Sequence, residues 1–254
     1  MQVQLRHRMK QNKYDDPEFF ARYGAMARST GGLAAAGEWP ALRAMLPPLG
    51  RARVLDLGCG FGWHARHARA QGAARVVGVD ISQKMLARAA ELDTQAGIDG
   101  IEYRRMAIED ATPALGTFDI VLSSLALHYV ADLAPVFANA FALLAPGGAF
   151  VFSMEHPVFT ARAEQDWHTG PGGARLHWPV DGYQDEGIRR TRWLADDVVK
   201  YHRTTATILN GVIGAGFRIA RVVEPAPGPE MVALSGEMRD ERRRPMFLLV
   251  AAHC

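Results

Sequence analysis

Short apolar runs alternate with helical patterns along most of the chain, and this alternation constrains the fold more than any other feature. Seven runs have the length and residue types of strands: 53–57, 74–79, 101–105, 118–123, 149–154, 217–224 and 245–252. Strands that alternate with helices favour a parallel sheet covered on both faces. No helical pattern separates the last two runs, so one is expected to be an antiparallel edge strand. The sequence predicts an α/β fold with a seven-stranded, mostly parallel, doubly wound sheet.

The helical stretches between these runs carry end signals. Ser82 and Asp132 stand where an N-cap side chain would accept hydrogen bonds from the first free amides of a helix. After Asp132, apolar residues recur at the i, i+3, i+4 and i+7 spacing of a buried helix face. Gly72 suits the end of a helix over 65–71, because glycine readily takes the left-handed conformation found there. A last helix is expected over 205–216.

Length and patterning favour a single domain over residues 1–254. Its expected parts are an N-terminal helical cap (1–48), a central segment with the first five strands (49–154), an insertion (155–203), and the last helix and strands (204–254). The insertion interrupts the alternation with glycine, proline and aromatic residues. Segments this long and irregular inside a domain are usually lids or binding elements, so a lid-like role is expected.

Composition excludes several classes. The 29 Lys and Arg residues nearly balance the 27 Asp and Glu residues, so the chain has no general field for nucleic acid or a membrane surface. Cys59 and Cys254 lie too far apart in sequence to suggest a metal motif or a disulfide framework. The apolar stretch 133–154 is broken by Pro146-Gly147-Gly148, and no apolar run opens the chain. A cytoplasmic protein without a metal is expected, and its oligomeric state stays open.

A glycine-rich turn follows the first strand, in the stretch Val54-Leu55-Asp56-Leu57-Gly58-Cys59-Gly60-Phe61-Gly62. Glycines let a backbone approach a ligand closely, and the helix that follows offers free amides. Asp80 ends the second strand, 20 residues after Gly60. A carboxylate at that place can accept hydrogen bonds from both hydroxyls of an adenosine ribose.

The spacing of the glycines distinguishes between cofactors. A dinucleotide fingerprint needs a third glycine at position 63, which holds Trp63. Asp56 precedes the first glycine by two residues, where it would repel a pyrophosphate but attract an ammonium. The loop therefore favours S-adenosylmethionine, a cationic nucleoside without phosphate, and disfavours NAD.

With these motifs the chain resembles the class I (Rossmann-like) S-adenosylmethionine-dependent methyltransferases, in particular the small-molecule group called methyltransferase type 11. The resemblance covers about Val54 to Met154 and implies that 49–154 is a cofactor-binding core. The fourth strand and the turn Leu143-Leu144-Ala145-Pro146-Gly147-Gly148 carry further motifs of the group. Implied cofactor contacts are Asp56, Gly58, Gly60 and Gly62 at the methionine part, Asp80 at the ribose, Ile81, Met85, Ile108 and Glu109 at the adenine, and Ser123 at the end of the fourth strand. Tyr14 and Tyr23 either fold over the cofactor or simply pack an N-terminal helix.

The acceptor is expected beyond the carboxyl ends of strands four and five, where ligands of open α/β sheets bind. His128, His156 and His202 are the candidates for a general base, and all three are expected to converge on one cavity with the insertion. Aromatic residues of the excursion 155–192 suggest either a pocket wall or a satellite core. His64 and His67 share one helix face, which is expected to be solvated rather than metal-binding.

Several functions remain open on this evidence. The leading one is methyl transfer to a small-molecule acceptor. An RNA or protein methyltransferase is the first alternative, but the (Asp/Asn)-Pro-Pro-Tyr motif of enzymes that methylate base amino groups is replaced by Ser123-Ser124-Leu125-Ala126, and no RNA-binding module is visible. A non-catalytic protein that binds S-adenosylmethionine is the second alternative. Nucleic-acid and membrane partners are not expected.

Overall fold

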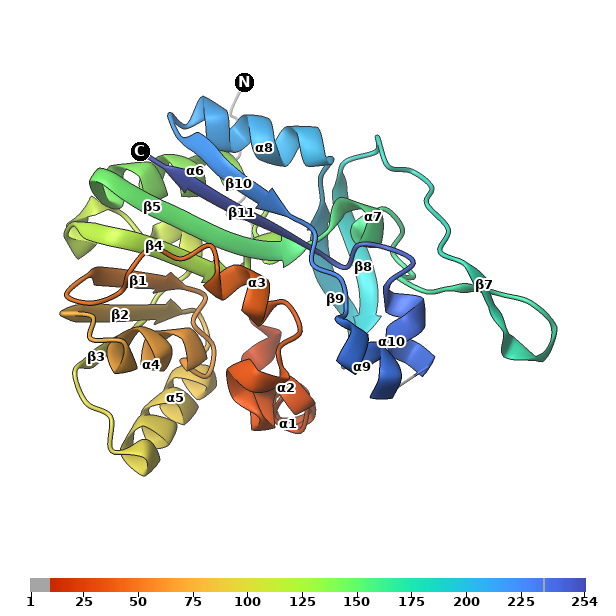
Figure 1. Ribbon diagram of the computed structural model, residues 1–254, viewed down its shortest axis with the longest axis horizontal. Helices are drawn as coiled ribbons and strands as arrows, with labels where there is room; N and C mark the ends of the chain where they lie inside the picture. Colours follow the sequence, from red (N-terminus) through yellow and green to blue (C-terminus); the bar gives the residue numbers. More distant parts are fainter. Residues whose placement is uncertain (1–9, 235) are drawn as a thin grey trace, which may run out of the picture.

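The computed structural model describes residues 10–234 and 236–254. Its centre is a seven-stranded sheet in the order β10-β11-β5-β4-β1-β2-β3 (Figure 1). The strands are β1 (Arg53–Leu57), β2 (Arg75–Asp80), β3 (Ile101–Arg105), β4 (Phe118–Ser124), β5 (Leu144–Glu155), β10 (Arg218–Val223) and β11 (Phe247–His253). The first five pair in parallel, whereas β11 pairs antiparallel with both β5 and the edge strand β10. The predicted fold class is confirmed, including antiparallel pairing at the edge.

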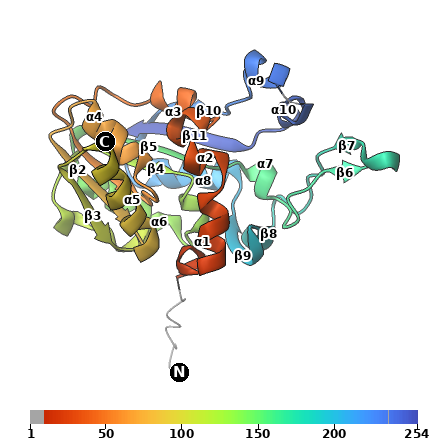
Figure 2. The ribbon, with the colours of Figure 1, turned by 90° about the horizontal axis from the view of Figure 1, so that it is seen from below.

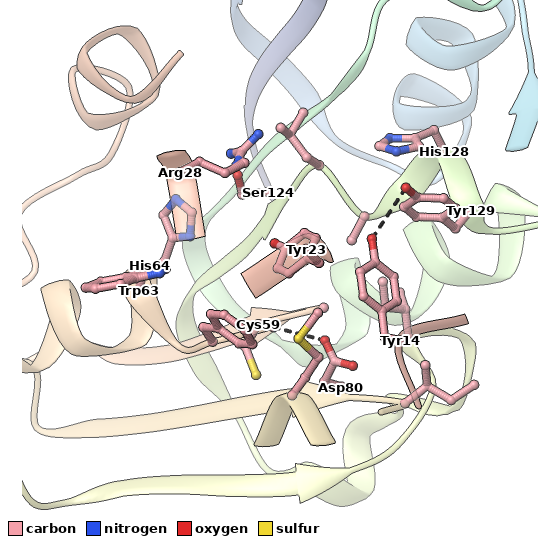
Figure 3. A pocket seen from close by; sticks show the side chains of 18 of the residues that line it. Tyr14, Tyr23, Arg28, Cys59, Trp63, His64, Asp80, Ser124, His128 and Tyr129 are labelled. Atoms are coloured by element: carbon pink, nitrogen blue, oxygen red, sulfur yellow. Dashed lines mark hydrogen bonds between the residues drawn. The ribbon is translucent and has the colours of Figure 1, made fainter. Parts of the chain in front are cut away.

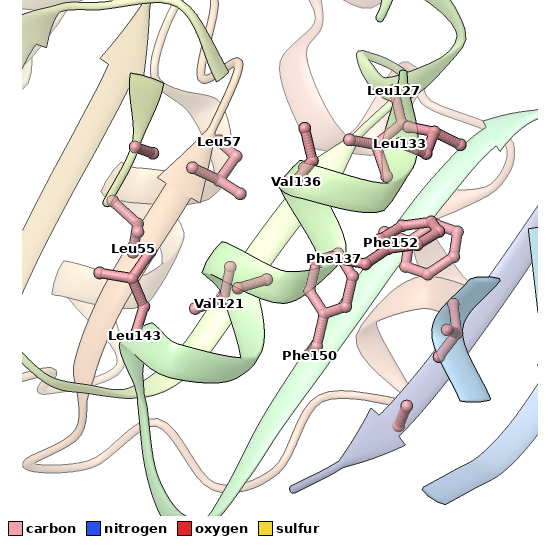
Figure 4. Close-up of a cluster of buried hydrophobic side chains, with 14 of the residues drawn as sticks. Leu55, Leu57, Val121, Leu127, Leu133, Val136, Phe137, Leu143, Phe150 and Phe152 are labelled. Atoms are coloured by element: carbon pink, nitrogen blue, oxygen red, sulfur yellow. The ribbon is translucent and has the colours of Figure 1, made fainter. Parts of the chain in front are cut away.

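Successive residues of each strand feed opposite layers, because side chains alternate across a sheet. In β1, Leu55 belongs to the buried cluster that includes α6 (Leu133–Leu143) and α8 (Thr205–Gly214), while Val54 belongs to the cluster that includes α4 (Trp63–Ala70) on the other face. Figure 4 shows the first of these layers, where Phe137 of α6 meets Phe150 and Phe152 of β5. Both faces are therefore covered, as expected for a doubly wound sheet.

The second layer also holds α3 (Trp39–Arg43) and α5 (Gln83–Ala96). Trp39 and Leu42 of α3 pack on β5 and β11. A buried ion pair between Arg66 of α4 and Asp93 of α5, with Nη1 and Oδ1 2.9 Å apart, joins the two helices. The layer brings the starts of α4 and α5 to the carboxyl ends of β1 and β2, where the glycine loop lies.

The predicted helix caps are confirmed. The Ser82 hydroxyl accepts a hydrogen bond from the Met85 amide at 3.1 Å, and an Asp132 carboxylate oxygen accepts one from the Ala134 amide at 3.0 Å. The prediction that no helix separates the last two strands is wrong, because α9 (Pro229–Leu234) and α10 (Gly236–Glu241) lie between them. Each has six residues, too few turns to display a helical period in the sequence.

From residue 10 onward the N-terminal segment is helical, in short pieces: η1 (Lys13–Asp15), α1 (Pro17–Gly24), α2 (Ala27–Thr30) and η2 (Gly32–Ala35). Residues 1–9 of the predicted cap lie outside the described residues. The short 3₁₀ turns η3 (Ile108–Asp110), η4 (Pro113–Leu115) and η5 (Leu127–Tyr129) follow β3 and β4. Asp16 caps α1 by accepting from the Glu18 and Phe19 amides. The segment is fastened to the core at Asp15, whose Oδ1 accepts from the Ser82 hydroxyl at 2.6 Å and the Lys84 amide at 3.1 Å.

The insertion is more ordered than its irregular sequence predicts. It contains α7 (Pro157–Thr160), the turn η6 (Pro171–Gly173), a small hairpin of β6 (His168–Thr169) and β7 (Arg175–His177), and a longer hairpin of β8 (Gly187–Trp193) and β9 (Ala195–His202). Figure 2 shows β6 and β7 projecting away from the sheet, whereas β8 and β9 lie beside α1. No helix in the described part of the chain is long and apolar enough to cross a membrane.

The β8–β9 hairpin and the N-terminal segment bind each other. The Gln11 side chain accepts from the Val199 amide at 2.7 Å and donates to the Val199 carbonyl at 3.3 Å. Arg22 donates to the Leu194 carbonyl at 2.7 Å. Phe19 packs edge-on against Trp193, with ring centroids 5.7 Å apart. Two segments outside the sheet thus form one joint cover over the carboxyl ends of its strands.

Candidate active site

A cavity of about 260 Å³ lies at the carboxyl ends of β1, β2 and β4, beneath the N-terminal segment. Figure 3 shows Asp80 and Cys59 on its floor, and two facing walls made by Arg28, Trp63 and His64 on one side and by Tyr14, His128 and Tyr129 on the other. This is the place where an open α/β sheet binds its ligands. The cavity is therefore the candidate active site.

Asp80 organises the floor of the cavity. Its Oδ2 accepts a hydrogen bond from the Gly60 amide at 2.9 Å, and its Oδ1 accepts one from the Ser82 amide at 2.8 Å. Each carboxylate oxygen has a second lone-pair site for a ligand hydroxyl. Burial raises the pKa of Asp80 to about 6, against the lowering effect of these amides. Asp80 links the glycine loop to the start of α5.

Asp56 lies deeper, at 1% exposure, and does not itself line the cavity. Neither of its carboxylate oxygens has a hydrogen-bond partner among the described residues. Burial, and then the negative charge of Asp80, raise the pKa of Asp56 to about 7, although the nearby backbone amide of Ala65 lowers it in part. A buried carboxylate without a partner lowers the stability of the folded protein. A positively charged ligand bound nearby would stabilise it, so Asp56 suits a cationic ligand.

The three glycines of the loop all have positive φ, but they lie against different neighbours. At Gly58, a Cβ would lie 2.5 Å from the Ala126 Cβ, so the loop and the end of β4 can approach only with glycine there. Gly58 and Gly60 line the cavity. Gly62 does not: it precedes α4, and a Cβ there would lie 2.3 Å from the Tyr103 hydroxyl.

The residues expected at the adenine gather at one end of the cavity. Ile81, Met85, Ile108 and Glu109 all line it, beside Asp80. The expectation for Ser123 is corrected. Its hydroxyl donates to the Leu57 carbonyl at 2.8 Å inside the sheet, and the residue has no exposed surface. Ser124 lines the cavity instead, because the side chains of neighbouring strand residues point to opposite faces.

Tyr14 and Tyr23 lie over the cavity rather than only packing a helix. Both line it, with ring centroids 5.3 Å apart in an edge-on arrangement. The Tyr14 hydroxyl lies 3.4 Å from the Tyr129 hydroxyl. Burial, reinforced by Tyr129, raises the pKa of Tyr14 well above its usual value, so its hydroxyl stays neutral. Aromatic rings of the N-terminal segment and of η5 thus shield the cavity from water.

The three predicted histidines do not converge. His128 lines the cavity. The ring of His156 is held between the Glu224 carboxylate, at 2.7 Å, and the Val158 amide, at 3.0 Å, as the N-cap of α7. The ring of His202 is held between the Thr160 hydroxyl, at 2.8 Å, and the Tyr183 carbonyl, at 2.9 Å. Neither of these two lines the cavity, because both rings are held by their partners away from it.

The aromatic residues of the excursion form a satellite core, not a pocket wall. Trp178 stacks on Phe159 with centroids 5.2 Å apart and meets Trp167 edge-on, while the Arg244 guanidinium lies 4.1 Å from the Trp178 ring centroid. From the insertion as a whole, only Glu155 and Trp193 reach the cavity among the described residues. The insertion thus contributes its first residue and one residue at the tip of the β8–β9 hairpin.

Two polar residues of the cavity were missed or misplaced by sequence reasoning. His64 lines the cavity instead of a solvated face, and burial lowers its pKa to about 3. Arg28 comes from α2, a helix of four residues without a motif, and only tertiary packing brings it into the cavity. Its Nη2 donates to a Glu38 carboxylate oxygen at 2.6 Å.

A glycine-rich turn after the first parallel strand and an acid after the second define a Rossmann-like enzyme that binds a nucleoside at the sheet's switch point. Comparisons with known proteins specify the class. The family model described as "Methyltransferase domain" matches residues 55–152. The chain is 49% identical to an S-adenosylmethionine-dependent methyltransferase from Mesorhizobium loti, with a TM-score of 0.80 over 88% of this chain and 100% of that one.

A second solved structure, described as an S-adenosylmethionine-dependent methyltransferase from Listeria monocytogenes, is 46% identical, with a TM-score of 0.78 over 86% of this chain and 98% of that one. A trans-aconitate 2-methyltransferase from Variovorax paradoxus is 34% identical over 157 residues, which cover 57% of this chain and 59% of that protein. The chain belongs to the S-adenosylmethionine-dependent methyltransferases, as the resemblance predicts.

Proposed function

We propose that the chain transfers a methyl group from S-adenosylmethionine to a small-molecule acceptor bound in the cavity over β1, β2 and β4. The proposal rests on one observation: the N-terminal segment and the β8–β9 hairpin together cover this cavity. A recessed cavity of about 260 Å³ beneath aromatic rings suits a small molecule better than an RNA strand or a protein chain. The relative named for trans-aconitate also supports a small acceptor.

The residues of the cavity fit the cofactor. Asp80 has lone pairs left for two ribose hydroxyls, and Ile81, Met85 and Ile108 give an apolar slot for a flat base. Asp56 holds unpaired carboxylate oxygens beneath the glycine loop, a suitable environment for a cationic ligand. When bound, S-adenosylmethionine supplies an electrophilic methyl group on a sulfonium.

The chain's own contribution to catalysis is to position the two reactants and to enclose them in the cavity. Asp80 keeps the glycine loop and the start of α5 in one arrangement. Tyr14, Tyr23 and Trp193 exclude water from above. Holding two reactants in the geometry of reaction supplies a large part of catalysis when the transferred group is already activated.

Calorimetry tests the cofactor assignment. Wild-type protein is expected to bind S-adenosylhomocysteine and S-adenosylmethionine but not NAD. Asp80→Asn keeps the shape of the side chain and loses its charge, so the affinity for S-adenosylhomocysteine is expected to fall about tenfold or more. Binding of NAD alone, or an unchanged affinity in a folded Asp80→Asn variant, would contradict the assignment.

The size of the acceptor is tested by label transfer. The protein is incubated with S-adenosylmethionine labelled in the methyl group and a bacterial extract, which is then separated into RNA, protein and small-molecule fractions. The label is expected in the small-molecule fraction, and to be lost with Asp80→Asn. Label in RNA or protein would refute the small-molecule proposal and leave the methyltransferase assignment intact.

A further inference from the structure

The side of the cavity away from the adenine end carries a fixed positive charge. Lys10 and Arg28 are the permanent cations that line the cavity in the described chain. Lys10 is bound to Asp110 at 2.6 Å, beside Glu109 at the adenine end. Arg28 lies on the opposite wall, with His64 and Ser124 (Figure 3).

Arg28 has donors to spare. Within residues 10–234 and 236–254, its only hydrogen-bond partner is Glu38, through Nη2 alone. Glu38 is 2% exposed and faces away from the cavity-lining set, so it anchors the guanidinium without occupying the space. A guanidinium offers five N–H donors in a planar fork that matches a carboxylate.

Glu155, the cavity-lining acid next to His128, is already neutralised. Glu155 lines the cavity, but its Oε1 accepts from the Lys200 ammonium at 2.5 Å and its Oε2 from the Gln165 amide at 3.1 Å. Lys200 is 1% exposed, with its Nζ 5.5 Å from the centroid of the Trp193 ring. Glu155 is therefore occupied and is not available to take a proton from an acceptor.

His128 is placed as a donor. Its Nδ1 accepts a hydrogen bond from the Glu155 amide at 3.3 Å, so in the neutral ring the proton sits on Nε2. Burial lowers the pKa of His128 to about 4, so the ring is neutral near pH 7. An imidazole in this tautomer gives a hydrogen bond through Nε2 and has no free lone pair to act as a base.

From this arrangement, and resting on the proposed function, we propose that the acceptor is a carboxylic acid, held by Arg28 and methylated on its carboxylate oxygen. The oxygen lone pair forms a bond to the methyl carbon while the carbon–sulfur bond breaks and its electron pair stays on sulfur. The products are a methyl ester and neutral S-adenosylhomocysteine. No proton is taken up or released, so no general base is required.

Other acceptor classes fit this cavity less well. A neutral alcohol needs a base to remove its proton, and neither Glu155 nor His128 can serve. An amine is a cation at neutral pH and would be repelled by Arg28 as well as by a sulfonium. A carboxylate is ionised already and is attracted by both charges.

S-adenosylmethionine has a carboxylate of its own, so the first experiment asks which carboxylate Arg28 holds. Arg28→Gln/Glu38→Gln removes the ion pair without leaving a buried charge unpaired, and Arg88→Gln, on the exposed face of α5, is the matched control. Affinities are measured for S-adenosylhomocysteine and for 5′-methylthioadenosine, which lacks the amino-acid part. Both are expected to stay within about twofold of wild type. A loss confined to S-adenosylhomocysteine would overturn the proposal, because Arg28 would then hold the cofactor.

The second experiment uses protein saturated with S-adenosylhomocysteine. Small aliphatic and aromatic acids are titrated against it, each beside its amide of the same skeleton. At least one acid is expected to bind about tenfold more tightly than its amide in wild type and in Arg88→Gln, and to lose that preference in Arg28→Gln/Glu38→Gln. A panel in which no acid binds better than its amide would refute a carboxylate acceptor while the cofactor site, measured separately, stands.

The third experiment tests the product. Acids that bind are incubated with S-adenosylmethionine labelled in the methyl group, and the product is treated with alkali. A methyl ester releases labelled methanol, whereas methyl ethers and methylamines keep the label. Alkali-stable label would show transfer to another atom and overturn the proposal.

Discussion

Two buried acids, Asp56 and Asp80, are expected to control the affinity of this protein for a charged ligand. Asp56 and Asp80 lie near each other under the glycine loop, and burial raises the pKa of both. Part of the energy of ligand binding must therefore go into ionising or stabilising these acids. Ligand affinity and protein stability should both depend on pH in a range where most carboxylates do not titrate.

The affinity for S-adenosylhomocysteine is predicted to fall in acid because of Asp80. At pH 8 the carboxylate, with a pKa of about 6, is ionised and accepts the ribose hydroxyls. At pH 5, one unit below this pKa, only about a tenth of the carboxylate is ionised. The side chain must then lose a proton before it can bind the ligand, which weakens binding about tenfold. Calorimetry at the two pH values measures this effect. Asp80→Asn should show a much flatter dependence, and an equal slope in both proteins would contradict the role of Asp80.

Asp56→Asn is predicted to stabilise the ligand-free protein more at pH 8 than at pH 5. The pKa of Asp56 is about 7 when folded and 3.8 in a model peptide, so between these values the folded state holds more protons than the unfolded state. The free energy of unfolding therefore falls as the pH rises through this window. Urea unfolding at both pH values measures it. A variant that differs from wild type equally at pH 5 and pH 8 would argue against a buried, unpaired carboxylate.

His202→Ala is predicted to lower stability without changing ligand affinity. The ring bridges the Thr160 hydroxyl and the Tyr183 carbonyl, and its loss leaves a buried gap and two unsatisfied groups, a cost of about 2–4 kcal/mol. Urea unfolding and calorimetry with S-adenosylhomocysteine separate the two effects. A folded variant of full stability that binds the ligand poorly would place His202 in the active site after all.

Among the elements, the N-terminal segment and the β8–β9 hairpin depend on one another. Gln11 pairs with both backbone groups of Val199, as a neighbouring strand would. Asp15 holds the same segment to the start of α5. The cover over the cavity is thus assembled from segments about 180 residues apart in sequence, and its opening should control how ligand enters and leaves.

Gln11→Ala is predicted to speed the dissociation of S-adenosylhomocysteine several-fold. Loss of two hydrogen bonds to Val199, each worth about 0.5–1.5 kcal/mol, loosens the cover while the cavity floor stays intact. Stopped-flow displacement measures the rate, with Gln95→Ala on the exposed end of α5 as the control. Equal rates in the two variants would mean that the cover does not limit release.

For the molecule as a whole, a bound ligand should raise the free energy of unfolding, because it contacts several parts of the fold at once. The cavity is lined by the N-terminal segment, the glycine loop, β4, the insertion and the segment before β11. S-adenosylhomocysteine at 100 times its dissociation constant should stabilise the fold by about 2.7 kcal/mol, or roughly 5–10 °C in a protein of this size. Thermal unfolding measures the shift. NAD at the same concentration should cause none, and a shift with NAD alone would contradict the cofactor assignment.

Much of the fold and the cofactor end of the site could be read from the sequence, because the signals are local. Period-two and period-3.6 patterns report burial within one element, and Ser82 and Asp132 cap helices through their own neighbours. The turn from Gly58 to Gly62 and the acid Asp80 are tied to consecutive strands of a parallel sheet, whose carboxyl ends necessarily meet.

The part of the cavity where we propose that the acceptor binds was decided only by tertiary structure. Arg28 and Trp193 reach the cavity from a four-residue helix and from a hairpin, and no local pattern links either to the glycine loop. His156 and His202 have the chemistry of a base in the sequence, but their ring nitrogens are taken by Glu224, after β10, and by Thr160 of the insertion, which only packing brings to them. Which side of a strand Ser123 faces, and which nitrogen of His128 bears the proton, depend on atoms far away in the chain. Local sequence sets which groups are present, whereas long-range packing sets which of them are free to react.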